Sequence, residues 1–190
     1  MKLVLASHNQ GKLAELRAIL EPAVPDLELI GYDGPEPVED GVSYLENALI
    51  KARAASLHSG LPAIADDSGL AVEILGGSPG IFSARWAGGR DNVENRQLLL
   101  KQLADVKPEH RAAAFVCTIA LVDAGSEISF TGFWSGSIAT EERGTNGHGY
   151  DPVFVPDGFD VTAAELEPEI KNALSHRAEA VSQLISFLNA

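Results

Sequence analysis

Four short segments of the chain combine polar, charged and glycine residues in patterns that suit phosphate, metal or nucleotide binding. The first is Ser7-His8-Asn9-Gln10-Gly11-Lys12, between an expected strand and an expected helix. Free backbone N–H groups in such a turn, with the positive end of a helix dipole, favour an anion. Lys12 lies near the helix N-terminus, where a cation is unfavourable unless an anion is close to it, so phosphate is the natural partner. The alternative is a plain N-cap at Asn9 beside a solvated lysine, and the spacing is not that of a Walker A loop.

The second segment, Ala65-Asp66-Asp67-Ser68-Gly69, lies at the end of an expected apolar strand at 63–65. Two adjacent acids are costly to bury unless they are paired or bind a metal. Carboxylate oxygens are preferred Mg²⁺ ligands, and because side chains alternate along a strand, one acid only is expected to face a given site. The alternative is an acidic turn, since Asp and Ser before Gly are ordinary turn residues.

The third segment is Gly144-Thr145-Asn146-Gly147-His148-Gly149-Tyr150-Asp151-Pro152. Its three glycines permit close approach of the backbone to a ligand. His148 and Tyr150 are candidates to stack on a base, and Asp151 is a candidate to anchor ribose, base or the loop itself. The alternative is a flexible, hairpin-like loop without a ligand.

The fourth segment contains Lys171, followed by Ser175-His176-Arg177 at the start of the last expected helix. Donors gathered there suit the acceptors of a base or a phosphate. The alternative is a helix capped by Ser175 with an arginine on the surface.

Three more polar residues lie near an S-x-x-E capping box formed by Ser43 and Glu46. Glu39 precedes the box in an acidic loop. Asn47 and Lys51 lie four residues apart on the helix that follows, outside the apolar stripe centred on Leu45 and Ala52, so a solvated helical face is their simpler interpretation.

The elements that must position these residues alternate between strand and helix patterns, which predicts a mixed α/β fold. Strands are expected at 2–6 and 27–31, at 63–75 with a turn at Ser68-Gly69, and at 112–122 and 128–138, the last two as antiparallel neighbours. Four helices are expected. The first spans 11–21, with Leu13, Leu16, Ile19 and Leu20 on one side, and the second follows the capping box, with Leu45, Ala48, Leu49, Ala52 and Ala55 at helical spacing. The third runs from Asp91 to about 104, and the last spans 175–188. Loops are expected at 32–42 and 76–90.

Composition narrows the class of protein further. The 190 residues suit one domain with or without two lobes, and no apolar run approaches the ~20 residues of a membrane span. The net charge of −13 disfavours nucleic-acid binding, which needs a basic surface. Cys117 is the one cysteine, so neither a disulfide framework nor a thiolate metal cage forms within the chain. We expect a cytoplasmic protein without a membrane partner.

The order and spacing of these motifs resemble the inosine/xanthosine triphosphate pyrophosphatase family, whose members remove nonstandard purine nucleotides. The resemblance spans nearly the whole chain. It rests on S-H-N-Q-G-K at 7–12, E-D-G at 39–41, E-N-A-L-I-K-A at 46–52, I-A-D-D-S-G-L at 64–70, G-G-S-P-G-I-F-S-A-R at 76–85, G-T-N-G-H-G-Y-D-P at 144–152, A-E-L at 164–166, Lys171 and S-H-R at 175–177.

The resemblance implies a fold and a set of roles. The fold would be one domain over 1–190, an elongated mixed sheet with two α/β lobes and a nucleotide-binding cleft between them, usually as a homodimer. Ser7–Lys12 would hold the triphosphate, Asp67 would accept a proton and touch Mg²⁺, and Glu39 would share the metal. Ser68 would contact substrate, and the nucleoside would be bound by His148, Gly149, Tyr150, Asp151, Lys171, His176 and Arg177. Asn47 and Lys51 are further candidates for substrate binding.

Two positions depart from the family pattern. The family usually has Phe where this chain has His148, and a neutral His can also stack on a purine, but its charge can change near pH ~6.5. Asn146 replaces a frequent Gly. The change at His148 would affect base affinity and its pH dependence rather than the reaction class, and the change at Asn146 is milder.

Two other functions fit parts of the same pattern. Maf-like pyrophosphatases share the general architecture but match these motifs less well, and a substrate panel separates the two families. A nucleotide sensor without catalysis would bind ITP without releasing pyrophosphate, and the presence of Asp67, Glu39 and Lys12 argues against it.

Overall fold

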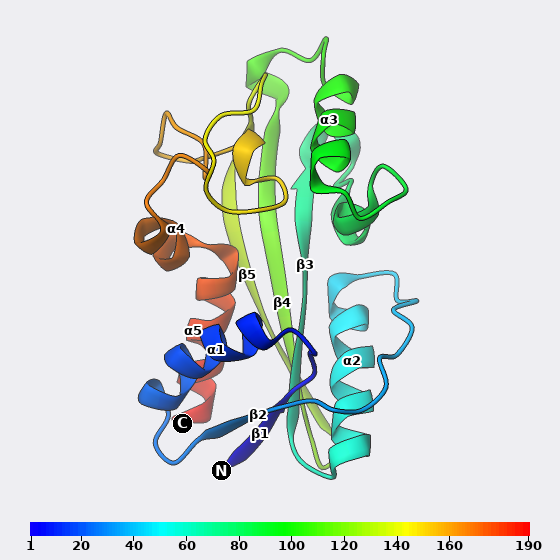
Figure 1. Cartoon of the computed structure of the whole chain (residues 1–190), viewed down its shortest axis with the longest axis vertical. Coiled ribbons are helices and arrows are strands. Elements are labelled where there is room, and N and C mark those ends of the chain that lie inside the picture. The colour runs from blue at the N-terminus through cyan, green and yellow to red at the C-terminus, as the bar shows by residue number, and fades with distance from the viewer. The chain divides into compact units, whose positions relative to one another are not determined.

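Strands and helices alternate along the chain in the computed structural model, which describes all 190 residues. The strands are β1 (Lys2–Leu5), β2 (Glu28–Gly31), β3 (Ala63–Val72), β4 (Ala112–Asp123), β5 (Ser126–Ile138) and β6 (Phe154–Pro156). The α-helices are α1 (Gln10–Ala23), α2 (Tyr44–Ser59), α3 (Asn92–Gln102), α4 (Pro168–Leu174) and α5 (His176–Leu188) (Figure 1). The predicted mixed α/β class is confirmed.

The six strands form one mixed sheet in the order β2-β1-β3-β4-β5-β6. β1 pairs in parallel with β2 and with β3, with Val4 opposite Ile30 on one side and Ala63 on the other. β4 and β5 are neighbours joined by a two-residue turn, a connection that only antiparallel strands can use. β6 pairs antiparallel with β5, with Phe154 opposite Ile138.

The chain divides into two compact units, each built from several segments. Unit 1 comprises Met1–Asp67, Cys117–Thr131 and Glu179–Ala190. Unit 2 comprises Ser68–Val116 and Gly132–Ala178. The boundary between Asp67 and Ser68 falls within β3, so two consecutive residues of one strand belong to different units.

Unit 1 has helices on both faces of its strands. Leu3, Leu5 and Ile64 pack with the buried side chains of α1 and α5, whereas Val4, Ala63 and Ala65 point to the opposite face, where Ala48, Ala52 and Ala55 of α2 are buried. Figure 1 shows α1 and α5 side by side and α2 across the strands from them. The alternation of side chains along each strand therefore assigns odd and even positions to different layers.

Unit 2 has its own apolar core. Leu70 and Val72 of β3 pack with Leu99 and Leu103 at the end of α3, and an aromatic cluster completes the interior. In that cluster the Phe115 ring lies 4.7 Å from the ring of Phe154, measured between centroids. This core supports the loop that carries residues 144–152.

Several predicted details of the elements are wrong. No turn interrupts residues 63–72: β3 is continuous through Ser68 and Gly69, beyond Ile64 where its pairing with β1 ends, and β4 is its neighbour on the other side. Ile19 and Leu45 are 41% and 39% exposed, so the buried stripes of α1 and α2 are narrower than the apolar pattern suggests. The loop expected at 76–90 contains a 3₁₀ helix, Gly80–Arg85, and α4 has no counterpart among the predicted elements.

No helix in the chain combines the length and the apolar character that crossing a bilayer requires.

Candidate active site

Asp66 and Asp67 point to opposite faces of β3, as the alternation of strand side chains predicts. Asp66 forms an ion pair with Lys12 of α1, and its side chain is only 8% exposed. Asp67 contacts residues of α2 on the other face. The two acids therefore serve different partners, and the alternative of an exposed acidic turn is wrong.

Asp67 is held by two side chains of α2. Its Oδ2 accepts a hydrogen bond from Asn47 Nδ2 at 3.1 Å, and its Oδ1 lies 3.9 Å from Lys51 Nζ. The same Nζ lies 3.2 Å from Glu39 Oε1, so one ammonium faces two carboxylates. Asn47 is 1% exposed and the Lys51 side chain 17%, which makes the interpretation of these residues as a solvated helical face wrong. Alanines at 48, 52 and 55 bring this side of α2 close to the strands.

Asn47 also fixes the acidic loop that carries Glu39. Its Oδ1 accepts a hydrogen bond from the backbone N–H of Gly41 at 3.0 Å, while its Nδ2 is used by Asp67. A Cβ on Gly41 would lie 2.7 Å from Asn47 Oδ1, so the absence of a side chain at residue 41 permits this approach. Asn47 is therefore shared between the loop and β3.

The start of α2 is set by the predicted cap. Ser43 Oγ accepts a hydrogen bond from Glu46 N, and Glu46 Oε2 reaches back to Val42 N, one residue before its usual target in a capping box. The cap places Tyr44 three and seven residues before Asn47 and Lys51, on the same side of the helix.

Two side chains, Tyr44 and Ser68, have a buried hydroxyl oxygen without a hydrogen-bond partner. Ser68 was predicted from the sequence as a substrate contact, whereas Tyr44 was not. Burial, and secondarily the charge of Asp67, raises the pKa of Tyr44 to about 12. Buried hydroxyls are normally bonded, so the Tyr44 oxygen on the Asp67 side of α2 suits a polar ligand there.

The segment 7–12 is anchored to the loop after β2. His8 Nε2 lies 2.9 Å from the carbonyl oxygen of Gly34, and the His8 ring stacks on Tyr32 at 5.5 Å between centroids. Asn9 Oδ1 accepts a hydrogen bond from Lys12 N, so the predicted N-cap is present. The lysine is not solvated, because it pairs with Asp66. Gln10 and Gly11 are exposed in the first turn of α1, and Ser7 Oγ accepts from Asn9 N.

In unit 2, Asp151 holds the glycine-rich loop together. It is 4% exposed, and its Oδ2 accepts hydrogen bonds from the backbone N–H of His148 at 2.8 Å and from Lys171 Nζ at 2.5 Å. Gly147 adopts a positive φ of 76°, and a Cβ there would overlap Asp151 Oδ2. Of the three roles considered for Asp151, the structure supports anchoring of the loop.

Tyr150 belongs to the core rather than to an open surface. It is 5% exposed, and its hydroxyl donates to the carbonyl oxygen of Ser83 at 2.8 Å. Burial also raises the pKa of its phenol. Stacking of the Tyr150 ring on a base does not fit this position, whereas the exposed His148 ring stays available. Arg96 also stabilises this loop, because its guanidinium donates a hydrogen bond to the carbonyl oxygen of Gly149. The two residues lie 53 positions apart, so the local sequence does not predict the contact.

The residues around the start of α5 also lie in unit 2. The His176 ring stacks on Phe115, with 5.0 Å between ring centroids and 12° between planes. Ser175 Oγ accepts from Ala178 N, which is the predicted cap, and Arg177 is partly exposed. Lys171 is placed on α4, where its ammonium reaches Asp151.

The structure thus gathers the candidate residues into two sets. Unit 1 brings Glu39, Asn47, Lys51 and Asp67 together, with the 7–12 segment joined to β3 through Lys12. Unit 2 brings His148, Asp151 and Lys171 together. Ser68 begins unit 2 directly after Asp67.

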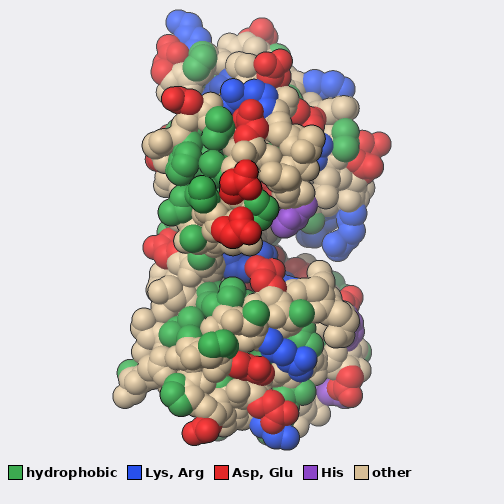
Figure 2. Space-filling view, turned by 60° about the vertical axis from the view of Figure 1, so that its left-hand side comes forward, with side chains coloured by type: hydrophobic (Ala, Val, Ile, Leu, Met, Phe, Trp, Pro, Cys, Tyr) green, Lys and Arg blue, Asp and Glu red, His purple; other side chains and the backbone are tan.

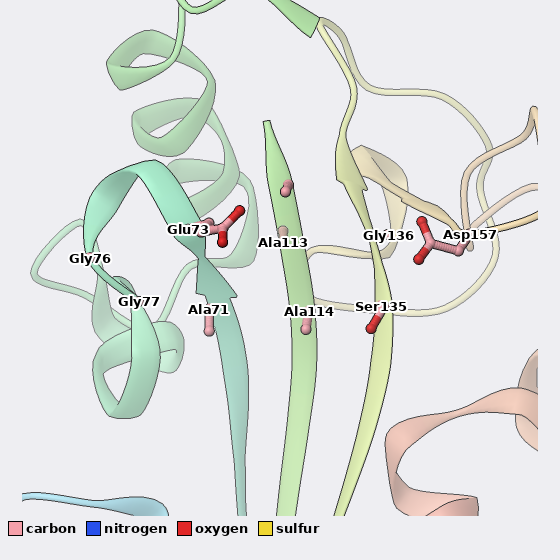
Figure 3. Close-up of a pocket in the computed structure, with 10 residues that line it drawn as sticks. Ala71, Glu73, Gly76, Gly77, Ala113, Ala114, Ser135, Gly136 and Asp157 are labelled. Atoms are coloured by element: carbon pink, nitrogen blue, oxygen red, sulfur yellow. The ribbon is translucent and has the colours of Figure 1, made fainter. Parts of the chain in front are cut away.

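A groove of about 560 Å³ in unit 2 uses none of these residues. Figure 3 shows the small side chains of Ala71, Ala114 and Ser135 on neighbouring strands, with Glu73 and Asp157 on either side.

Figure 2 shows red acidic side chains interspersed with fewer blue basic ones and no broad basic area on the face in view.

Comparison with known proteins agrees with the sequence motifs. The sequence model of the Ham1 family matches residues 3–187. A dITP/XTP pyrophosphatase from Leifsonia xyli subsp. xyli is 56% identical, with 100% of this chain and 96% of the relative covered. A dITP/XTP pyrophosphatase from Pseudomonas aeruginosa is 50% identical, with 96% and 94% covered. The solved structure of a HAM1 protein from Coxiella burnetii has a TM-score of 0.93 at 42% identity and covers 99% of this chain and 98% of its own.

Proposed function

Since the chain belongs to the Ham1 family, we propose that it hydrolyses nonstandard purine nucleoside triphosphates, namely ITP, dITP and XTP, to the monophosphate and pyrophosphate. This reaction removes such nucleotides from the nucleotide pool. The observation that carries the proposal is the convergence of Asn47, Lys51 and Glu39 around Asp67. Relatives that cover nearly the whole chain bear the name of this activity.

Asp67 is the proposed catalytic residue. It orients a water molecule toward the α-phosphorus and accepts its proton while pyrophosphate leaves. The Asn47 amide occupies Oδ2, which fixes the plane of the carboxylate and directs Oδ1 toward the side of Lys51. A base held in one orientation contributes more than a mobile one, because its proton acceptor is already placed.

The acids of unit 1 suit Mg²⁺. Glu39 and Asp67 already face one cation, the Lys51 ammonium, so their oxygens converge. No cluster of three or more His, Cys, Asp or Glu side chains forms a complete metal cage, and Mg²⁺ commonly uses one or two carboxylates with waters and substrate phosphates as its other ligands. We propose Glu39 and Asp67 as the protein ligands. When bound, Mg²⁺ neutralises charge on the phosphates and on the departing pyrophosphate.

The triphosphate is proposed to bind at Ser7, His8, Asn9, Gln10, Gly11 and Lys12, with Ser68 as a further contact. Gln10 and Gly11 lie in the first turn of α1, where backbone N–H groups lack helical acceptors. Lys12 and Lys51 supply the positive charge that an acidic protein must concentrate locally to bind a triphosphate.

The nucleoside is proposed to bind through His148, Gly149, Tyr150, Asp151, Lys171, His176 and Arg177. Hypoxanthine and xanthine carry an oxygen at C6, which suits N–H donors such as the Arg177 guanidinium. The amino group of adenine would face the same donors without an acceptor, which is a costly contact. Because the Tyr150 ring and the Asp151 carboxylate are buried, their contribution would come from holding the loop and from the backbone.

The test is pyrophosphate release from ITP, XTP, GTP and ATP, with Mg²⁺ and with EDTA. Fast release from ITP and XTP that requires Mg²⁺, with little from GTP and ATP, supports both the reaction and the substrate class. Release of phosphate in place of pyrophosphate, or equal rates with all four nucleotides, contradicts the proposal.

We also propose that the enzyme works as a homodimer in the cytoplasm, as the family resemblance implies. Sedimentation equilibrium tests the first point, and fractionation of cells tests the second.

A further inference from the structure

Lys51 occupies the position between the two acids that the proposed function assigns to the metal. Its Nζ lies 3.2 Å from Glu39 Oε1 and 3.9 Å from Asp67 Oδ1. The side chains of Lys51 and Asp67 are 17% and 14% exposed and that of Glu39 is 38% exposed, so water screens the Asp67 pair less than the Glu39 pair. The Lys51 ammonium thus faces both carboxylates.

A divalent cation on the same carboxylates would lie a few ångströms from this ammonium. Like charges at such distances repel strongly where water is scarce. The Lys51 side chain would have to turn away, and its long flexible stem allows this. Without an anion elsewhere, the displaced ammonium would leave two charge partners and gain none. Metal binding to the free protein is therefore opposed by Lys51.

A triphosphate removes this opposition, because its oxygens give the ammonium a new partner. Glu39 and Asp67 are then released to the metal, and the two ligands assist one another. Lys12 forms a similar pair with a different acid, Asp66, on the opposite face of β3. Lys12 therefore offers a matched comparison: it has the same charge and lies in the same unit, but it is paired to an acid outside the proposed metal ligands.

We propose that Lys51 couples metal binding to triphosphate binding. It holds Glu39 and Asp67 in the free protein and gives them up to the metal only when a triphosphate receives its ammonium. This inference rests on the proposed function, since it takes Glu39 and Asp67 as the metal ligands. Its consequence is that the free enzyme holds little metal and avoids an assembled hydrolytic centre without substrate.

The experiment measures Mn²⁺ binding to the full chain without nucleotide, by electron paramagnetic resonance of free Mn²⁺. Wild type is compared with Lys51→Met and Lys12→Met. We expect the Lys51→Met protein to bind Mn²⁺ about tenfold more tightly than wild type, within the range of ordinary coupling between sites. Lys12→Met removes the same charge and should change the Mn²⁺ affinity much less. Mn²⁺ alone should also raise the Tm of Lys51→Met more than that of wild type.

Circular dichroism shows whether each variant is folded, and Lys51→Gln replaces Lys51→Met if the latter is insoluble. Equal Mn²⁺ affinities in wild type and a folded Lys51 variant, or equal gains in the two lysine variants, would overturn the coupling role. If wild type still releases pyrophosphate from dITP in that case, the proposed function stands. If wild type releases none and binds no Mn²⁺ even with a non-hydrolysable α,β-imido analogue of ITP, the proposed function fails and the inference fails with it.

Discussion

Asn47 Nδ2 lies 3.1 Å from Asp67 Oδ2, and this hydrogen bond joins the first turns of α2 to the middle of β3. The other end of the same amide binds Gly41 N. Both the oxygen and the nitrogen of the Asn47 amide are hydrogen-bonded, and the two partners identify which atom is the oxygen and which is the nitrogen. Its position fixes the Asp67 carboxylate on one side and the end of the loop before α2 on the other.

Replacement of Asn47 by Ala should lower both activity and stability. Asp67 would lose the donor that orients it, and Gly41 N–H would lose its acceptor, which costs about 1–3 kcal/mol for a group kept from water. We expect kcat for dITP to fall at least about tenfold with a smaller change in KM, because orientation acts on the chemical step. Kinetics and urea unfolding measure the two effects. Asn92→Ala, at an exposed asparagine of α3, is the control, and matching losses in both variants would argue against the positioning role.

Replacement of Asp67 by Asn should remove most turnover while leaving the fold intact. The amide keeps the shape of the side chain but cannot accept the proton, and the loss of a general base is expected to reduce kcat by about 10²–10⁴. Pyrophosphate release measures the rate, and thermal unfolding checks the fold. Asp105→Asn, at an exposed position, should behave as wild type. Near-normal turnover in Asp67→Asn would refute the assignment of Asp67 as base.

The glycine-rich loop offers a matched pair of substitutions. Gly147 and Gly149 both have positive φ, 76° and 60°, so an alanine at either position carries a backbone penalty of about 1–2 kcal/mol. A Cβ at residue 147 would also overlap Asp151, whereas a Cβ at residue 149 meets nothing within 4 Å. Urea unfolding should therefore show a larger loss for Gly147→Ala, and KM for dITP should rise more in that variant. Equal effects would mean that the Asp151 contact is unimportant.

Tyr44 predicts a specific dependence of stability on alkaline pH. Burial, and then the Asp67 charge, raises the pKa of Tyr44 from 10.0 to about 12 in the folded chain. Below pH 10 the phenol is neutral in both states, so its contribution to stability is fully present. Between about pH 10 and 12 it ionises only when unfolded, and stability is lost.

Tyr44→Phe removes this loss and deletes a buried hydroxyl that has no hydrogen-bond partner. The variant should be up to about 1 kcal/mol more stable at pH 7, and its free energy of unfolding should fall less steeply between pH 10 and 12. Urea titrations at several pH values measure both quantities. A steeper decline in Tyr44→Phe than in wild type would contradict the assignment, and the core residue Tyr150, unchanged in both proteins, contributes equally to each.

Local patterns predicted much of the fold because they report local physics. The caps at Asn9, Ser43 and Asp91 satisfy N–H groups within three residues, and they mark the starts of α1, α2 and α3. The two strands around Ala124-Gly125 are runs rich in β-forming residues interrupted by a turn, and they form as predicted. The sheet overrode the local pattern at Ser68-Gly69, where two turn-forming residues continue β3 beside its neighbour β4.

In the candidate site, too, local sequence predicted some features, whereas others depend on contacts between distant residues. The motifs named the residues around Asp67, but hydropathy alone placed Asn47 and Lys51 in solvent, because polar side chains buried by mutual pairing carry no apolar signal. The contacts from Tyr150 to Ser83 and from Arg96 to Gly149 join positions 67 and 53 residues apart, and nothing in either local sequence reveals its partner.

The interleaving of the two units restricts how this protein can be divided or rearranged. Unit 1 needs three separate stretches of chain and unit 2 needs two, so no single cut of the coding sequence yields either unit whole. Neither unit can be exchanged with a relative by one simple recombination event. An insertion in any of β3, β4 and β5 would disturb strands that contribute to both units. Asp67, the acid proposed for proton transfer, and Ser68 after it therefore cannot be separated by exchanging one unit without breaking β3.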